Sequence, residues 1–188
     1  MVATSNLCDK SLKRLAAKKK SLSIQYIPNS AFTLDAESQE HPLIAQVLEA
    51  NVSAAETPAG LPPHIQRLCE SDLLEFEQEQ MLFRAMNHRK FRAASLCKAI
   101  DVDIAQRSDL EQIDRLLREA QVIREHLIKA NMRLVISIVK KFVSSQSTFD
   151  EMLSDGLVAL MNCVDKFDYE RGFRFSTYAY RSIARDLY

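Results

Sequence analysis

The densest group of side chains able to do chemistry lies near the end of the chain, in FDYERGFRFSTYAYRSIARDLY, from Phe167 to Tyr188. Seven aromatic residues and four arginines fall here, in a protein with no tryptophan, nine phenylalanines and five tyrosines. Arginines neutralise phosphates, and aromatic rings stack on bases that have left a duplex. The same residues could instead form an aromatic core with solvated arginines, and their types alone leave both interpretations open.

A helix beginning near Ser176, after a break at Gly172, is expected to position these groups. At about 100° per residue, its apolar back consists of Ala179, Tyr180, Ile183 and Leu187. Its front consists of Tyr178, Arg181, Ser182, Arg185 and Tyr188. Directly before this helix lie two more arginines and two more aromatic residues, Arg171, Phe173, Arg174 and Phe175.

Two further helices are predicted upstream. In NMRLVISIVKKFV, helical spacing gives an apolar face of Met132, Val135, Ile136, Val139, Phe142 and Val143. Thr148 and Glu151 then form a capping box at the start of the next helix. That helix has an apolar stripe of Phe149, Leu153, Leu157, Leu160, Val164 and Phe167. Its opposite, acidic face is either a solvated surface or a docking site for a basic partner.

The earlier part of the chain is predicted to be helical from Leu68 onward. Ser71 is the expected cap of one helix, and Ser108 with Glu111 forms a second capping box. No proline or glycine follows as far as Val143, which indicates one long helix or two abutting ones. Residues 1–63 are expected to be a partly disordered extension with one short helix at Pro42 to Asn51. The basic cluster KRLAAKKK is either solvated or an arm that touches nucleic acid.

The composition favours an all-α protein and argues against several classes of function. Only three glycines occur in 188 residues, fewer than sheets with tight turns usually need. The four cysteines form no C-x-x-C pair, so no metal site is expected and the thiols are read as reduced, in the cytoplasm. Neither a glycine-rich phosphate loop nor a membrane-length apolar run occurs. We therefore expect no enzyme, no cofactor and no membrane partner.

Two long motifs resemble a known family. NMRLVISIVKKF and FDEMLSDGLVALMNCVDKFDYERGFRFSTYAY, within Asn131 to Ile183, are similar to conserved region 2 of bacterial sigma factors of the sigma-seventy family. FEQEQMLFRAMNHRKFRA is similar, more loosely, to the preceding region 1.2. The resemblance implies a compact helical bundle of the sigma domain 2 type with a poorly ordered N-terminal extension. We expect an extension at 1–63, a helical segment with a long helix or hairpin at 64–130, and region 2 at 131–188.

The resemblance also implies partners. Such proteins are bacterial, non-enzymatic factors that bind core RNA polymerase and direct it to promoters. They help to open the minus-ten element by capturing flipped bases of the non-template strand. The docking helix meets a basic coiled coil of the polymerase beta-prime subunit, and the matching positions are Asp150, Glu151, Ser154 and Asp155. An anti-sigma factor is a further partner that the resemblance allows.

The DNA-binding positions follow from the same motifs. Around the first captured base the family pattern places Arg171, Phe173, Phe175 and Tyr178, with Thr177 in the same motif. A pocket for a later base corresponds to Asn131, Leu134, Ser137 and Ser176. Contacts to phosphates or duplex edges are expected from Arg174, Arg181 and Arg185.

The chain departs from the family at several positions. Arg181 and Ser182 stand where family members usually carry two tryptophans that hold the edge of the bubble. Arg185 replaces a common glutamine and would favour guanine, and Leu157 replaces a polar residue of the docking helix. The later helix-turn-helix is missing, so a C-terminally truncated chain is expected. These departures leave a second hypothesis open, a degenerate sigma-like module that docks on polymerase without opening promoters.

Overall fold

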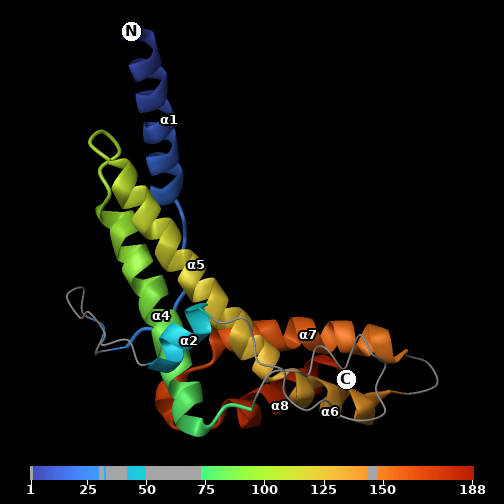
Figure 1. The fold of residues 1–188 in the computed structure, drawn as a ribbon. Helices are drawn as coiled ribbons and strands as arrows, with labels where there is room; N and C mark the ends of the chain where they lie inside the picture. Colours follow the sequence, from blue (N-terminus) through green and yellow to red (C-terminus); the bar gives the residue numbers. More distant parts are fainter. Residues whose placement is uncertain (1, 30–31, 33–41, 50–72, 144–147) are drawn as a thin grey trace. The chain divides into compact units, whose positions relative to one another are not determined.

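The computed structural model describes residues 2–29, 32, 42–49, 73–143 and 148–188. All regular structure in these ranges is helical, which confirms the all-α prediction. The helices are α1 (Val2–Lys20), α2 (Pro42–Glu49), α4 (Phe76–Ala99), α5 (Arg107–Ala130), α6 (Met132–Phe142), α7 (Phe149–Lys166), η1 (Tyr169–Arg171) and α8 (Phe175–Asp186) (Figure 1). Within the described ranges, no helix is both long enough and apolar enough to cross a membrane.

The chain divides into two units, and α4 and α5 contribute to both of them. The first unit contains Met1–Ser38 and Ala85–Gln121, and the second contains Gln39–Arg84 and Val122–Tyr188. This division differs from the three consecutive segments expected from the sequence. The second unit holds all the residues expected to bind DNA or polymerase.

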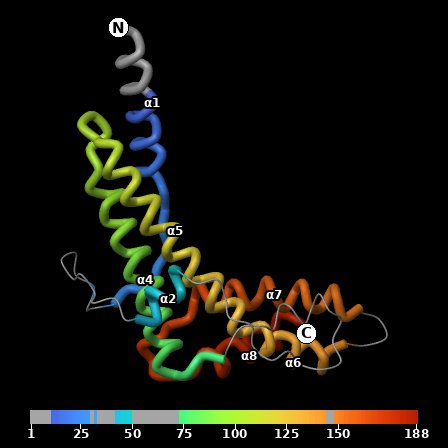
Figure 2. Tube along the Cα trace, viewed as in Figure 1, coloured from blue at the N-terminus to red at the C-terminus, as the bar shows by residue number. Residues whose placement is uncertain are grey.

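In the first unit, α1 packs against the α4–α5 hairpin (Figure 2). Ala16 of α1 is fully buried in a cluster with Cys97, Ile100, Leu110 and Ile113. Two lysines of the basic cluster KRLAAKKK form ion pairs, Lys13 with Asp103 at 3.1 Å and Lys19 with Asp114. The sequence did not predict this helix, because its apolar face is narrow and interrupted by lysines.

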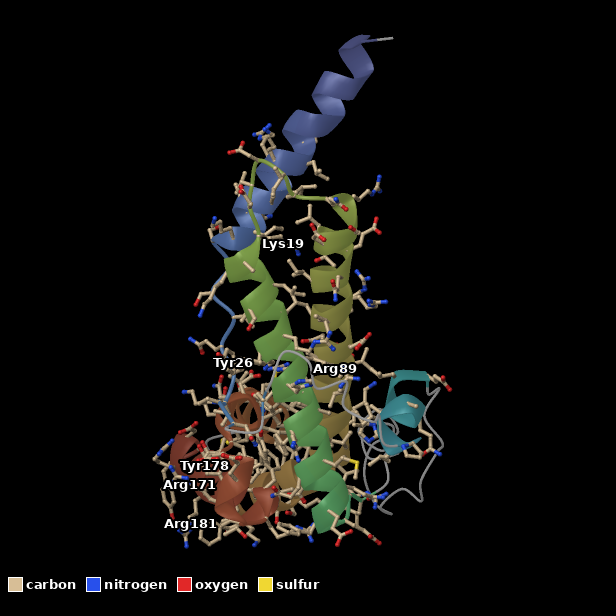
Figure 3. All side chains as sticks on the ribbon, turned by 90° about the vertical axis from the view of Figure 1, so that its left-hand side faces the viewer. Lys19, Tyr26, Arg89, Arg171, Tyr178 and Arg181 are labelled. Atoms are coloured by element: carbon tan, nitrogen blue, oxygen red, sulfur yellow. The ribbon has the colours of Figure 1, made fainter. Side chains whose placement is uncertain are left out.

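A second set of contacts in the first unit holds the hairpin and the segment that follows α1. Arg89 of α4 and Glu119 of α5 pair at 2.8 Å, and the Arg89 side chain is almost completely buried. The ring of Tyr26 packs edge-on against Phe91, with 5.6 Å between ring centroids. Figure 3 labels Lys19, Tyr26 and Arg89 on these elements.

The helix starts expected in the earlier part of the chain are only partly found. The capping box at Ser108 and Glu111 is wrong, because α5 begins one residue before Ser108 and the N–H of Gln106 donates to Asp109 Oδ2 at 3.0 Å. α4 begins at Phe76, and Ser71, its expected cap, lies outside the described residues. The short helix expected from Pro42 is present as α2.

The sequence left open one long helix or two abutting ones, and the structure has two, with Asn131 between α5 and α6. The Asn131 side-chain amide donates to the Leu127 carbonyl at 2.8 Å. This bond satisfies a carbonyl at the end of α5, which has no partner within the helix. The chain can therefore change direction here without a glycine or proline.

Helices α6, α7 and α8 pack against one another in the second unit. The apolar face predicted for α6 is buried at Met132, Val135, Ile136 and Val139, whereas Val143 is 41% exposed. The capping box that starts α7 is also confirmed, since Thr148 Oγ1 accepts from the Glu151 N–H at 3.3 Å and Glu151 Oε2 accepts from the Thr148 N–H at 3.2 Å. The Thr148 hydroxyl also donates to Glu151 Oε2 at 2.9 Å, and this bond, together with the one from the Thr148 N–H, lowers the pKa of Glu151.

Two glycines have specific roles in the second unit. A Cβ on Gly156 of α7 would lie 2.9 Å from Val135 Cγ1 and 3.2 Å from Val139 Cγ2, both on α6. Glycine therefore permits the close approach of α7 to α6. Gly172 has φ +72°, a left-handed conformation that L side chains rarely adopt, and it ends η1 before α8 begins. The predicted break at Gly172 is confirmed.

Candidate nucleic-acid interface

A stack of aromatic rings forms the base of the candidate site. Phe83 of α4 lies 4.9 Å from Phe167 and 5.1 Å from Phe175, measured between ring centroids. Phe167 in turn lies 5.6 Å from Tyr178, which is 36% exposed. Aromatic pairs at these distances stabilise the fold by more than the burial of their apolar surface alone would. The stack therefore supports the Tyr178 ring from below and leaves part of it accessible.

The structure corrects the expectation for Phe175. Its ring is fully buried and contacts Phe83 and Phe167, so no part of it is available to stack on a base. Phe175 is the first residue of α8, one residue before the expected start of this helix. The residue supports the site from the core rather than meeting DNA.

A buried carboxylate on α4 anchors the start of α8. Glu79 is only 4% exposed, and its Oε1 accepts from the Phe175 N–H at 2.6 Å. Its Oε2 lies 3.1 Å from the Arg174 guanidinium. Arg174, the residue preceding α8, makes no capping hydrogen bond with its own side chain. Glu79 therefore supplies a cap from a distant part of the chain.

Replacing Glu79 by alanine is expected to lower the free energy of unfolding by about 1–3 kcal/mol, because the buried Phe175 N–H would lose its acceptor. Glu79→Gln keeps an oxygen that can accept this hydrogen bond and is expected to lose less. Urea unfolding followed by circular dichroism measures both changes. Equal losses in the two variants would show that the charge, rather than the cap, makes the contribution.

A groove of about 650 Å³ opens beside the stack. Its lining comes from the end of α7, the η1 segment and the front of α8, namely Lys166, Phe167, Asp168, Arg171, Phe173, Thr177, Tyr178, Arg181, Ser182 and Arg185. Phe173 is 63% exposed, so a second accessible ring lies in the same groove as Tyr178. Figure 3 shows the labelled Arg171, Tyr178 and Arg181 gathered around α8.

The groove has an excess of positive charge. Four of its lining residues are cations and one, Asp168, is acidic. Asp168 pairs with Arg171 at 2.9 Å, while Arg185 lies 3.3 Å from both Asp186 and the Ser182 hydroxyl. Burial raises the pKa of the Tyr178 hydroxyl further above neutrality, where a tyrosine is already protonated and can donate. Cations around aromatic rings are the combination that single-stranded nucleic acid requires.

The groove gathers six of the residues expected to bind DNA, namely Arg171, Phe173, Thr177, Tyr178, Arg181 and Arg185. Arg174 lies outside its lining and is held by Glu79. The four positions expected for a later base are also outside this lining. Among them, Asn131 and Ser137 donate to backbone carbonyls of their own segment, and Leu134 and Ser176 are half-buried.

Three lining residues and one exposed ring were not predicted from the sequence. The three lining residues are Lys166, Phe167 and Asp168, whereas Ser182 had been placed on the front of α8. Tyr180 was assigned to the apolar back of α8 but is 40% exposed, which corrects that assignment. Glu79 and Phe83 could not be found by local patterns, since their partners on α8 lie far away in the sequence.

The acidic face predicted on α7 is exposed at Asp150, Glu151, Ser154 and Asp155. Glu151 is engaged in the capping box, and Ser154 donates to the Asp150 carbonyl at 2.9 Å. Val158 and Met161 expose apolar surface farther along the helix, at 58% and 41%. Asp165 instead pairs with Arg124 of α5, with N–O distances of 3.0 and 2.8 Å. Asp165 is therefore a structural residue of the second unit.

Comparison with known proteins agrees with this geometry. Residues 127–188 match the family described as Sigma-70 region 2. A stretch of 72 residues is 40% identical to RNA polymerase sigma factor SigA2 of Synechococcus elongatus, covering 38% of this chain and 22% of that protein. The chain thus matches under a quarter of the relative's length. Residues 127–188 are therefore similar to sigma-70 region 2.

Proposed function

We propose that this chain is a sigma factor that binds core RNA polymerase and takes part in transcription initiation at bacterial promoters. In this proposal, it recognises the minus-ten element and helps to open it by holding unstacked bases of the non-template strand. The role is binding, not catalysis. The observation that carries the proposal is the groove in which the exposed rings of Phe173 and Tyr178 lie among four cations.

Flipping a base out of a duplex costs a few kcal/mol, which the protein must offset with new contacts. Tyr178, supported by Phe167, offers a partly exposed ring for stacking. Arg181 is exposed and forms no ion pair within the described ranges, so its guanidinium can reach a phosphate. Arg171 and Arg185 can add further phosphate or base-edge contacts from the same groove. The groove therefore offers both contacts that a single strand needs, a ring for stacking on a base and cations for its phosphates.

The second part of the proposal concerns the exposed face of α7. Asp150 and Asp155 provide carboxylates, and Val158 adds an exposed apolar residue beside them. Complementary charges steer association and fix the orientation of partners. We propose that this face docks on a basic element of core RNA polymerase, the coiled coil of the beta-prime subunit.

Asp155→Arg is expected to weaken binding to core RNA polymerase by roughly tenfold or more, because an arginine would face a basic partner. The fold should be unaffected, since Asp155 is exposed on α7. Affinity is measured with purified core enzyme and the labelled full chain. Glu77→Arg, the same charge change at an exposed position of α4, is the matched control. Equal affinities of Asp155→Arg and Glu77→Arg would rule out this docking face.

A second candidate function is favoured by one observation. Arg181 and Ser182 line the groove where the family usually has tryptophans, so the groove lacks the aromatic wedge expected from the family resemblance. A module that docks on polymerase without opening DNA would bind core enzyme but show no preference for the minus-ten sequence. Binding of single-stranded minus-ten oligonucleotides by the full chain, with and without core enzyme, separates the two functions.

A further inference from the structure

A second ring–cation contact lies outside the groove, between α6 and α8. The Lys141 ammonium lies 5.4 Å from the centroid of the Tyr180 ring, and Tyr180 is 40% exposed. Tyr180 does not line the groove. Tyr180 lies two positions after Tyr178, so its side chain is turned by about 200° around the helix from that of Tyr178. Tyr180 is therefore a separate exposed ring rather than an extension of the Tyr178 stack.

The charges around Tyr180 favour an anionic partner. Helix α6 contains no acidic residue and has the exposed Lys140 and Lys141 in its last turn. The acidic residue of α8 is Asp186, which lies 3.3 Å from Arg185. The surroundings of Tyr180 on these two helices thus combine an exposed ring with two lysines, and a phosphate placed there would meet no carboxylate of either helix.

The position of Tyr180 also fits a strand that leaves the groove. Ser176 precedes Tyr180 by four residues on α8, and Ser137 precedes Lys141 by four residues on α6, so each pair shares a helix face. Ser137 and Ser176 are positions expected to hold a later base of the captured strand. A strand that joins the groove to these positions would therefore come close to Tyr180.

We propose that Tyr180 and Lys141 form a further binding position for the same single strand, in which the Tyr180 ring stacks on an unpaired base and Lys141 contacts a phosphate. This inference rests on the proposed function, because it requires the chain to hold single-stranded DNA. It adds a third exposed ring to those of Phe173 and Tyr178.

The test is an abasic scan of a single-stranded minus-ten oligonucleotide, with the full chain bound to core RNA polymerase. Each base is removed in turn, and affinity is measured for the unsubstituted chain, Tyr178→Ala and Tyr180→Ala. Tyr180→Ala is expected to weaken binding of the intact oligonucleotide roughly 5- to 150-fold, the range for loss of one stacked base. In Tyr180→Ala, removal of the base that stacks on Tyr180 should cause no further loss of affinity. In Tyr178→Ala, the base whose removal has no further effect should be a different one.

Two more variants separate stacking from charge. Tyr180→Phe keeps the ring and is expected to keep the affinity, whereas Lys141→Gln should lower the salt dependence of binding by about one phosphate contact. If Tyr178→Ala weakens binding and Tyr180→Ala does not, this inference is wrong while the proposed function stands. If the unsubstituted chain binds no oligonucleotide, both fail. Competition by a poly-glutamate peptide as strong as that by DNA would assign the surface to an acidic protein instead.

Discussion

Phe175→Ala is expected to lower the free energy of unfolding by about 3–5 kcal/mol, as is usual when a core phenylalanine is truncated. The Phe175 ring is fully buried and contacts two other rings, with centroids 5.1 Å away at Phe83 and 5.2 Å away at Phe167. Its removal would leave a cavity between α4 and α8, within the second unit. Urea unfolding followed by circular dichroism measures the loss.

Phe173→Ala is the matched control for this prediction, because Phe173 lies two residues earlier and is 63% exposed. Its truncation should change stability by only about 0.5 kcal/mol or less. Comparison of the two variants thus distinguishes a phenylalanine that supports the fold from one that can contact DNA. If Phe175→Ala retained full stability and lost only DNA binding, the core assignment of Phe175 would be refuted.

Tyr178→Ala is expected to weaken binding of single-stranded minus-ten DNA by about 1–3 kcal/mol, the usual contribution of one stacked base. Tyr178 lines the groove, is 36% exposed and is supported by Phe167 at 5.6 Å. Because Tyr178 belongs to α8 and lines the groove rather than the exposed face of α7, docking on core polymerase should be unchanged. Fluorescence anisotropy of a labelled oligonucleotide measures the affinity.

Tyr178→Phe serves as the control here, since it retains the ring and loses only the hydroxyl. It is expected to bind nearly as well as the unsubstituted chain if stacking dominates. A loss of helix content in Tyr178→Ala would mean that the ring belongs to the core. Unchanged affinity with an intact fold would mean that the groove does not hold a base through Tyr178.

The amphipathic faces were predictable where both ends of a helix were marked in the sequence. The capping box at Thr148 and Glu151 fixed the start of α7, and the apolar stripe then identified Leu153 and Leu160 as core residues. The apolar face of α6 was predicted from helical spacing alone, although the start of this helix was not marked. In each case the information was local, and the neighbouring helices only had to cover a face already defined by the sequence.

The exposure of Tyr180 and the burial of Phe175 could not be predicted from local sequence. Tyr180 follows the buried Ala179, about 100° around the helix, so it lies at the border of the apolar face. Only the position of α6 decides whether such a residue is covered. Phe175 lies at the start of α8, where a small error in the helix boundary changes the predicted direction of its side chain.

Glu79 could not be predicted, because capping rules apply to residues close in sequence. Its hydrogen bond to the Phe175 N–H joins positions 96 residues apart. Nothing in the sequence near Glu79 distinguishes it from the other acidic residues at the start of α4. The same is true of Arg124 and Asp165, whose pairing depends on α5 and α7 lying side by side.

The most direct test of the central claim compares the affinities of the full chain for two single-stranded oligonucleotides, the non-template minus-ten sequence and a scrambled sequence of equal composition. Both are measured with and without core RNA polymerase. The proposed function predicts a clear preference for the minus-ten sequence in the presence of polymerase, and loss of that preference in Tyr178→Ala. Polymerase binding with equal affinity for the two oligonucleotides would contradict it and support a module that docks without opening promoters.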